Sequence, residues 1–474
     1  MVRAHARPSR LMTWRLGVIL RRLKVNNGAP LKALDIGCRR GAFQRRMNSA
    51  TQWTIMDEPS QITTTGIQRD KKSPHLLGIF VSWRLEAYGY TLAVFYAICL
   101  AYMYWLGVWL VNAEGVPTYH DFTNIWVAST QAVHGRAAQV YDQAAQAKAQ
   151  EVLVGAGRAI FSTWPYPPSY LVILAPLGML PYLTAFLAWQ LVTLLGCVVA
   201  VYLIVRRREA IALVLASPFT VCNILTGQSG FLTATLLGVS LSQLERRRVL
   251  AGLFIGCLTY KPQLGMLLPL ALAAANQWRA FAGASITALI LAAASVIAFG
   301  TGIWAAFPQE LVAQANGSLF ADCQVQWGYL QTVYGRVRYL NGGPTLAWFA
   351  QGATTSVATV TVWFIWRSPT PYVLKAATLS AGTLIATPYA FDYDLAAIAI
   401  PVAFLARDQI DRGLLSGEQT ILLAAFALAF VEIAAAGRLP VGAVILAALL
   451  CLIVRRTRRQ NSETADAPEA LAWL

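Results

Sequence analysis

The chain has few charged residues for its length. Of its 474 residues only 13% are charged, whereas 57% are hydrophobic. Soluble domains carry about 25% charged residues, and a soluble protein of this composition could not cover its surface with polar groups. The scarcity of charge excludes an ordinary soluble class and predicts an integral membrane protein.

Acidic residues are scarcer than basic ones, at 22 against 38, which leaves a net charge of +16. Such an excess in a soluble protein can indicate nucleic-acid binding. Here the arginines form short blocks between apolar runs: Arg206–Arg208, Arg246–Arg248 and Arg455–Arg459. Cytoplasmic loops of membrane proteins retain Lys and Arg in this way. We therefore interpret the arginine blocks as signals of membrane topology. The predicted partners include membrane lipids but no nucleic acid.

Cysteine motifs are also missing. The seven cysteines lie mostly inside apolar runs and form no CxxC or Cys/His spacing, so neither a zinc site nor a disulfide framework is indicated. The sequence predicts no metal and no cofactor. The first apolar stretch, Leu11–Leu20, is interrupted by Arg15, and we expect no cleavable signal peptide.

Residues 1–86 are predicted to form a basic, poorly ordered cytoplasmic extension. Leu34–Gly41 is similar to the glycine loop of S-adenosylmethionine-dependent methyltransferases, but Arg39 stands where that loop has its second glycine. About 50 residues separate this loop from the first span, too few for a doubly wound domain. The alternative is a mis-assigned start, for which Met56 is a candidate.

Apolar segments fill residues 87–454 and predict ten to twelve membrane spans, each needing about 20 apolar residues. Among the predicted segments are Tyr88–Val111, Ala210–Leu225 and Pro344–Trp366. The arginine blocks predict that both termini, including the tail 455–474, are cytoplasmic. Two large outer loops are expected, at 112–182 and 301–343. In the first, Phe122–Val133 and Asp142–Leu153 have helical periodicity and predict helices on the outer membrane surface.

The apolar stretch Val249–Ala275 allows two topologies, because Lys261-Pro262 lies in its middle. A single span would put Arg279 and the later basic loops outside. Two short segments meeting at Lys261 keep these loops inside, so this topology is preferred. Lys261 then lies at the outer tip, and an ionisable residue at membrane depth is a functional hypothesis.

Under this topology the unusual polar residues converge on the outer side. They are Asp121, Tyr166, Gln228, Lys261, Arg336, Arg338, Asp392 and Asp394. We therefore predict a site at the outer membrane surface, with acidic groups, cations and aromatic rings.

An ordered set of short motifs resembles one family. These are Asp121-Phe122, Val140-Tyr141-Asp142, Tyr166-Pro167-Pro168, Thr226–Gly230, Tyr260–Gln263 and Ala386–Asp394. Over roughly residues 88–406 the chain resembles glycosyltransferase family 87. The resemblance implies an all-α integral membrane fold of the GT-C type. It also implies sugar transfer, with mannose the family expectation, from a polyprenyl-phosphate donor to a glycan or glycolipid acceptor on the non-cytoplasmic face of the cell membrane.

The resemblance implies residue roles as well. Asp121 stands at the position of the family's general base, and the expected transfer inverts the anomeric carbon. Lys261, then Arg336 and Arg338, are candidates to bind the donor phosphate. Candidates for substrate binding are Tyr166, Gln228, Asp392 and Asp394. The Asp392-Tyr-Asp394 pair is not assigned to a metal, because a lipid-phosphate donor has no diphosphate to chelate.

Simpler interpretations stay open for these residues. Asp121 could cap a helix, Lys261 could extend to the headgroups, and Arg336 and Arg338 could anchor the loop to anionic lipid. Gln228 could belong to a tight turn. For the whole chain the main alternative is a transporter or flippase of lipid-linked sugars; a catalytically inactive scaffold is another.

Overall fold

The structure is a computed structural model, and it describes residues 74–157, 163–317, 324–435 and 439–471. The chain divides into two units, Met1–Lys71 and Lys72–Leu474. The Leu34–Gly41 motif and Met56 lie outside the described residues. Within the described ranges all regular elements are helices, so the predicted all-α class is confirmed.

Some helices begin or bend where the chain has proline. α2 starts at Pro74, inside the extension predicted to be poorly ordered up to residue 86, and proline suits a first helical turn. The helices and 3₁₀ turns are α2 (Pro74–Trp105), α3 (Asp121–Val133), η1 (Ala137–Tyr141), α4 (Gln143–Val154), α5 (Pro168–Leu174), η2 (Ala175–Met179), α6 (Tyr182–Val205), α7 (Glu209–Leu215), α8 (Pro218–Thr226), α9 (Gly230–Gln243), α10 (Arg248–Cys257), η3 (Leu258–Tyr260), η4 (Pro262–Leu264), α11 (Leu268–Ala274), α12 (Trp278–Phe299), α13 (Gly302–Gly317), α14 (Gln324–Tyr329), α15 (Val333–Tyr339), α16 (Pro344–Arg367), α17 (Tyr372–Ala386), η5 (Asp392–Ile398), α18 (Ala399–Arg412), α19 (Glu418–Ala434) and α20 (Gly442–Leu471).

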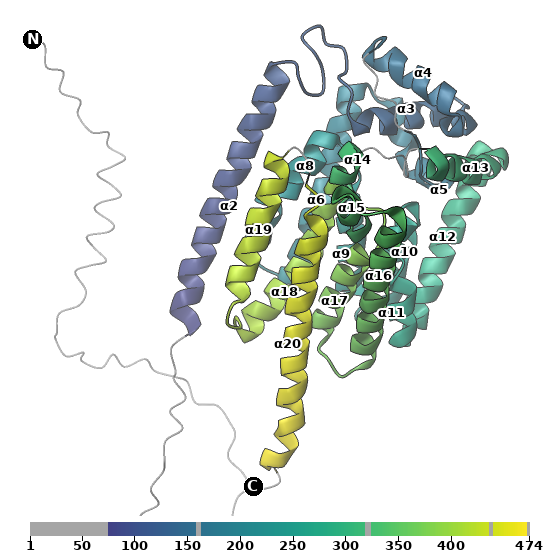
Figure 1. Cartoon of the computed structure of the whole chain (residues 1–474). Helices are drawn as coiled ribbons and strands as arrows, with labels where there is room; N and C mark the ends of the chain where they lie inside the picture. Colours follow the sequence, from purple (N-terminus) through teal and green to yellow (C-terminus); the bar gives the residue numbers. More distant parts are fainter. Residues whose placement is uncertain (1–73, 158–162, 318–323, 436–438, 472–474) are drawn as a thin grey trace, which may run out of the picture. The chain divides into compact units, whose positions relative to one another are not determined.

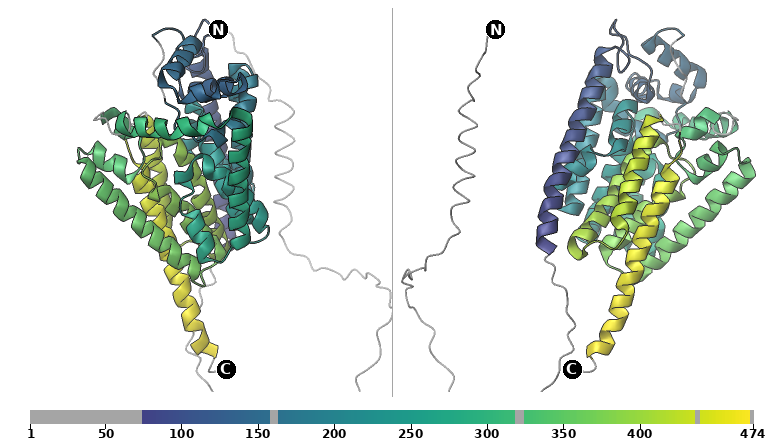
Figure 2. Two further views of the ribbon diagram at one scale, coloured as in Figure 1. Left: turned by 90° about the vertical axis from the view of Figure 1, so that its right-hand side faces the viewer. Right: turned by 60° about the vertical axis from the view of Figure 1, so that its left-hand side comes forward.

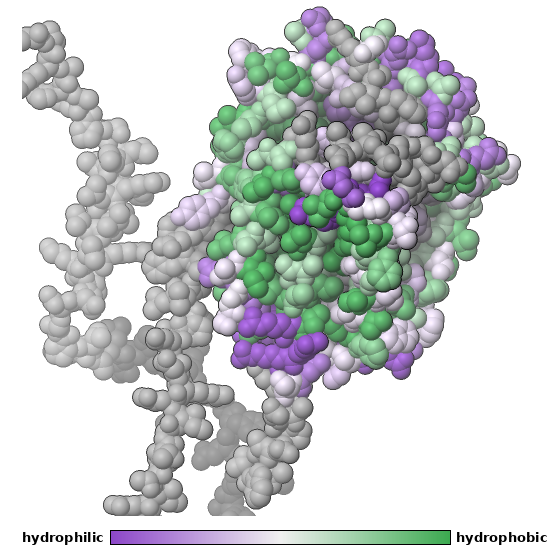
Figure 3. All heavy atoms as spheres, in the orientation of Figure 1, coloured by the Kyte–Doolittle hydropathy of each residue, from purple (hydrophilic) through white to green (hydrophobic). Residues whose placement is uncertain are grey.

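Several helices are suited to a bilayer. Among the helices of the described ranges, three are long and apolar enough to cross one: Glu86–Trp105 within α2, α6 and α12. The pair α7 and α8 would make a fourth, bent by 56°. Figure 3 shows apolar side chains over the middle of the bundle and hydrophilic ones toward both ends. The membrane class is therefore supported, while the count of ten to twelve spans stays a prediction.

The two ends of the bundle differ. α3, α4 and α13 run across one end, at the top of Figure 1, and Figure 2 shows the same arrangement from two other sides. We call this the loop end. The opposite end carries the arginine blocks Arg206–Arg208 after α6, Arg246–Arg248 after α9 and Arg455–Arg459 within α20, and we call it the arginine end. The predicted surface helices of the first loop correspond to α3 and α4, within one residue at each boundary.

Three predicted segments need correction. The first span, predicted to reach Val111, ends at Trp105, because Gly107 and Leu110 adopt positive φ and the chain turns there. The predicted span 210–225 is split at Ser217-Pro218, since proline disfavours helix in the residue before it. The predicted tail 455–474 is helical up to Leu471, because its Arg, Gln, Glu and Ala residues continue the helix.

The predicted break at Lys261 is confirmed. α10 passes into η3, Lys261 leaves the helical region with φ −132° and ψ 75°, and Pro262 begins η4. Pro262 lacks the N–H that a continuous helix would need, so the break is fixed by the sequence.

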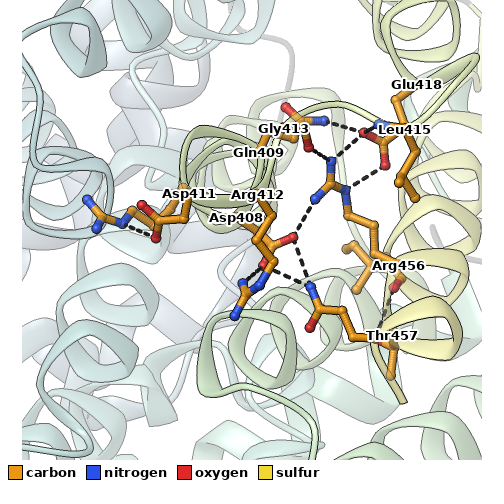
Figure 4. A network of polar contacts seen from close by, with 12 residues as sticks. Asp408, Gln409, Asp411, Arg412, Gly413, Leu415, Glu418, Arg456 and Thr457 are labelled. Carbon is orange, nitrogen blue, oxygen red and sulfur yellow. Dashed lines mark hydrogen bonds and ion pairs between the residues drawn. The ribbon is translucent and has the colours of Figure 1, made fainter. Parts of the chain in front are cut away.

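A buried network of charges joins α18, α19 and α20 at the arginine end (Figure 4). Arg456 donates two hydrogen bonds of 2.6 Å to the two carboxylate oxygens of Glu418 and a third to Asp408. Asp408 also accepts from Arg412. Asp408 and Glu418 are fully buried and Arg456 is 3% exposed. Paired and hydrogen-bonded in this way, the charges are tolerated in the interior.

The side chain of Gln331 connects the second loop to the last two helices. Its Nε2 donates to Glu432 on α19 at 3.1 Å and to the carbonyl of Leu439 at 3.3 Å. Its Oε1 accepts from the N–H of Gly442 at the start of α20 at 2.9 Å. Its own N–H donates to the carbonyl of Ala390 at 2.8 Å, beside Asp392. The side-chain amide of Gln331 therefore bonds to α19, to α20 and to the connection between them, while its backbone N–H bonds to the turn before Asp392.

Candidate active site

Asp121 is the first residue of α3, where the N-terminus of a helix favours a negative charge. The preceding His120 fixes the direction in which the helix begins. Its Nε2 lies 2.9 Å from the hydroxyl of Tyr182, and its ring packs against Phe122 and Phe186. Burial lowers the pKa of His120 to about 4, so the ring is neutral at physiological pH. Its role is to position the start of α3.

Three breaks between helices bring further polar groups to Asp121. Gln228 lies in the turn between α8 and α9, Lys261 between η3 and η4, and Asp392 at the end of the turn after α17. Gly230 allows this convergence: a Cβ there would lie 2.0 Å from the carbonyl oxygen of Tyr393, so a larger residue would push the two breaks apart. Irregular backbone within a membrane bundle is tolerated where it is buried in protein or lines a water-filled cavity.

Lys261 makes a buried ion pair. Its Nζ lies 2.6 Å from Oδ1 of Asp394, and both side chains are at most 3% exposed. Oδ2 of Asp394 accepts from the N–H of Phe391 at 3.2 Å. The ammonium group also lies 4.8 Å from the ring centre of Tyr393 and 5.6 Å from that of Tyr166. Lys261 is therefore enclosed by an acid and two aromatic faces, an arrangement that stabilises its charge.

The site contains more acidic than basic side chains. Burial, and then the charge of Asp392, raise the pKa of Asp121 to about 7, while a hydrogen bond from Gln228 and the charge of Lys261 oppose this rise. Burial also raises the pKa of Asp392 to about 6. Three carboxylates thus share one ammonium group. A carboxylate whose pKa is near neutrality can both accept and release a proton at physiological pH.

Aromatic side chains from the first loop form one wall of the site. The hydroxyl of Tyr166 donates to Oε1 of Gln228 at 3.3 Å. Trp164 and Tyr170 pack on Tyr166, with ring centres 4.8 Å and 5.1 Å away, and Tyr260 lies 4.6 Å from Tyr170. These contacts hold Tyr166 and Gln228 beside Lys261.

Arg336 and Arg338 lie on α15, in a neighbouring cluster. Arg338 donates to the carbonyl of Gly342 at 3.0 Å, and its guanidinium lies 4.9 Å from the ring centre of Trp327. Arg336 is half-buried on the same helix. α15 is joined to the Asp392 turn through Thr332, which donates to the carbonyl of Pro388 at 3.2 Å. The structure thus gathers six of the eight predicted residues and leaves the two arginines on an adjoining helix.

Sequence reasoning missed Glu432. It is fully buried near the loop end of α19, bonded by Gln331 and within electrostatic range of Asp392. The signal was present, because Glu432 is the acid inside the apolar run 420–436. Sequence reasoning also missed the positioning role of His120. In the sequence this residue resembles a polar loop residue, and its aromatic neighbours are known only from the structure.

The arrangement provides one carboxylate suited to removing a proton, one cation and several aromatic faces. Among the described residues no group of three His, Cys, Asp or Glu side chains has the geometry to hold a metal ion. Asp121 and its neighbours therefore offer acid–base and electrostatic chemistry from the chain's own side chains.

Comparison with known proteins adds the family. No curated protein and no solved structure matches the chain. A family model matches residues 164–388, which contain Tyr166, Gln228 and Lys261; Asp121 precedes this region, and Asp392 and Asp394 follow it closely. The matching model is that of glycosyltransferase family 87, so the resemblance predicted from the motifs is confirmed over residues 164–388.

Proposed function

We propose that the chain transfers a sugar from a polyprenyl-phosphate donor to a glycan or glycolipid acceptor, with Asp121 as the general base. The match to the model of glycosyltransferase family 87 supports glycosyltransferase activity. The observation that carries the rest is the environment of Asp121, whose pKa is raised to about 7 beside a second acid. A base of this pKa removes a proton efficiently near neutral pH.

In the proposed reaction the acceptor hydroxyl attacks the anomeric carbon as its proton passes to Asp121. The bond from that carbon to the phosphate oxygen breaks, and polyprenyl phosphate leaves with the electron pair. Attack from the face opposite the leaving group inverts the anomeric carbon. An oxocarbenium-like transition state is expected, as in glycoside hydrolysis. Mannose is the sugar we propose.

The leaving phosphate needs a fixed cation. Lys261 is the first candidate because it is buried beside Asp121, and its pairing with Asp394 means that donor binding must draw the ammonium toward the phosphate. Arg336 and Arg338 are the next candidates, from the adjoining helix. Tyr166, Gln228, Asp392 and Asp394 are proposed to contact the substrates.

The proposed setting is the cell membrane, with a GT-C arrangement of ten to twelve spans. The loop end would face the non-cytoplasmic side, and both termini would be cytoplasmic. The positive-inside rule supports this orientation, because the arginine blocks lie at the opposite end. A lipid-phosphate donor would reach Asp121 from the bilayer without crossing it.

The test is transfer of radiolabelled mannose from polyprenyl-phosphate mannose to endogenous acceptors, in membranes containing the wild type or Asp121→Asn at matched expression. We expect the variant to lose roughly 10²–10⁴-fold in rate, the contribution of a positioned base. Asp142→Asn is the matched control: this exposed acid caps α4 in the same loop, and asparagine caps helices equally well.

Each outcome has a consequence. Loss in Asp121→Asn alone supports the reaction and the base. Equal rates in both variants keep the transferase and remove Asp121 as its base. If the folded wild type transfers no sugar from any lipid-phosphate donor tried, the proposal fails and a transporter or flippase of lipid-linked sugars takes its place.

A further inference from the structure

A second polar feature lies at the arginine end, far in the fold from Asp121. It is a cavity of about 480 Å³ between the starts of α10 and α12. Its lining residues include four arginines, Arg246, Arg247, Arg248 and Arg279, and one acid, Glu245. Four like charges around one cavity repel one another, so the cavity favours an anion.

The packing of α10 on α12 makes this crowding unavoidable. Both helices begin at the cavity and run toward the loop end, so their N-termini lie side by side (Figure 1). A Cβ on Gly252 would lie 2.4 Å from the carbonyl oxygen of Ala280 and 3.0 Å from the Cα of Gly283. The two backbones are therefore in contact near their starts, and the positive ends of two helix dipoles reinforce the arginines.

Three other arginines at the same end are neutralised within the protein. Arg407 pairs with Asp411, Arg412 with Asp408, and Arg456 with Asp408 and Glu418. In the described parts of the chain, none of the four arginines around the cavity makes an ion pair within 4.0 Å. Glu245 also lines a neighbouring hollow, where its charge acts on Lys375. Glu245 offsets only part of this charge, so among the described residues the positive charge of the cavity is not fully balanced.

The surroundings of the cavity favour a lipid. Val249, which lines the cavity, is 56% exposed, and Trp278, the residue before Arg279, is 58% exposed. Along α12, the exposed side chains of Ile286, Leu289 and Ile290 continue from the cavity as an apolar strip. A headgroup in the cavity would leave its acyl chains against this strip. Arginine binds phosphate through two parallel hydrogen bonds, a geometry that suits a phosphodiester.

We propose that this cavity binds the phosphate headgroup of an anionic phospholipid from the adjacent leaflet. The proposal does not depend on the sugar-transfer reaction. The same chemistry would accept free phosphate, and the experiment separates the two sources. The phosphate of the lipid offsets part of the charge of the four arginines and stabilises the contact between α10 and α12 at its start.

The test uses the full chain, purified and placed in phosphatidylcholine bilayers with or without a minority of phosphatidylglycerol. Retained phosphatidylglycerol is counted by native mass spectrometry, and the thermal unfolding midpoint is measured in both bilayers. The test variant replaces Arg246, Arg247 and Arg248 with glutamine. The control replaces Arg206, Arg207 and Arg208 with glutamine. These substitutions remove the same charge from the same end, but the three residues lie outside this cavity.

We expect the test variant to bind phosphatidylglycerol about fivefold more weakly for each arginine removed, and to lose the stabilisation that this lipid gives. The control should keep most of both. Arg279→Gln, on the other helix, should weaken binding by about fivefold alone. The four side chains are exposed, so the variants are expected to fold.

Three results would overturn the proposal. Equal losses in the test and control variants would mean that the arginines act as general surface charge. Full retention in the test variant would mean that the cavity is not the binding site. If inorganic phosphate stabilises the wild type in phosphatidylcholine alone, at matched ionic strength and to the same extent as phosphatidylglycerol, the ligand is free phosphate rather than a lipid.

Discussion

The site around Asp121 and the network around Arg456 both bury charged side chains, but they balance these charges differently. At the arginine end, each buried carboxylate of the network pairs with an arginine, and Arg456 bonds both oxygens of Glu418. At the loop end, Asp121, Asp392 and Asp394 share Lys261. Buried charge is expensive unless it is paired. The balanced network holds helices together, whereas the unbalanced site keeps a carboxylate that can take up a proton.

The largest effect should come from breaking the balanced network. Arg456→Met leaves Asp408 and Glu418 buried without their shared cation, and we expect a loss of roughly 3–5 kcal/mol in the free energy of unfolding. Arg455→Met is the control, because this neighbouring arginine is exposed and donates to the carbonyl of Ser416. Thermal and denaturant unfolding in detergent give the comparison. Equal losses in the two variants would show that burial of the network is unimportant.

The ion pair at the loop end should couple more weakly. Lys261→Met and Asp394→Leu each leave the other member of this ion pair without its partner, whereas the double variant removes both members, so it should be more stable than the sum of the single losses predicts. We expect a coupling of about 1–3 kcal/mol between contacting residues. The double variant should still fail in sugar transfer if Lys261 holds the phosphate. Additive losses would contradict the pairing.

The pH dependence should separate activity from stability. Because the pKa of Asp121 is raised to about 7, transfer should increase as the pH rises through 7 and the base becomes ionised. The contribution of Asp121 to folding has the opposite sign: it is fully present below the ordinary pKa of 3.8 and is lost as the pH rises through about 7.

Asp392→Asn should sharpen this result. Removing the negative charge beside Asp121 should move the rise of the pH–rate profile to lower pH, because that charge helps to raise the pKa of Asp121. Asp411→Asn, at the arginine end, should leave the profile unchanged. A profile that keeps its midpoint in Asp392→Asn would argue against Asp121 as the titrating base.

The smallest effect should follow from breaking an exposed pair. Lys148 lies 3.3 Å from Glu151 on α4, with the lysine side chain 74% exposed. Lys148→Ala should change the free energy of unfolding by less than about 0.5 kcal/mol, since water screens such pairs. A loss comparable to that of Arg456→Met would mean that proximity alone, rather than burial, sets the strength of these interactions.

Hydropathy and proline predicted much of this fold from the sequence. The helices α3, α4 and α16 and the break at Lys261 lie where the residue pattern puts them. The bend at Ser217-Pro218 was missed because an apolar stretch does not show whether its helix is straight. The extension of α20 was missed because a helix can continue beyond its last apolar residue. The sequence did not show which side chains would pair with each other in the folded protein. Lys261 and Asp394 are 133 positions apart, and no local pattern reveals that they pair.

The side chain of Gln331 has a consequence for modularity. Gln331 lies inside the family-matched region, but it bonds to Glu432, Leu439 and Gly442, which lie beyond it. A chain cut after Arg412 would leave this amide without those partners, next to the turn that carries Asp392. The last two helices therefore belong to the same compact unit as the turn that carries Asp392, and the limits of sequence similarity do not mark a separate structural unit.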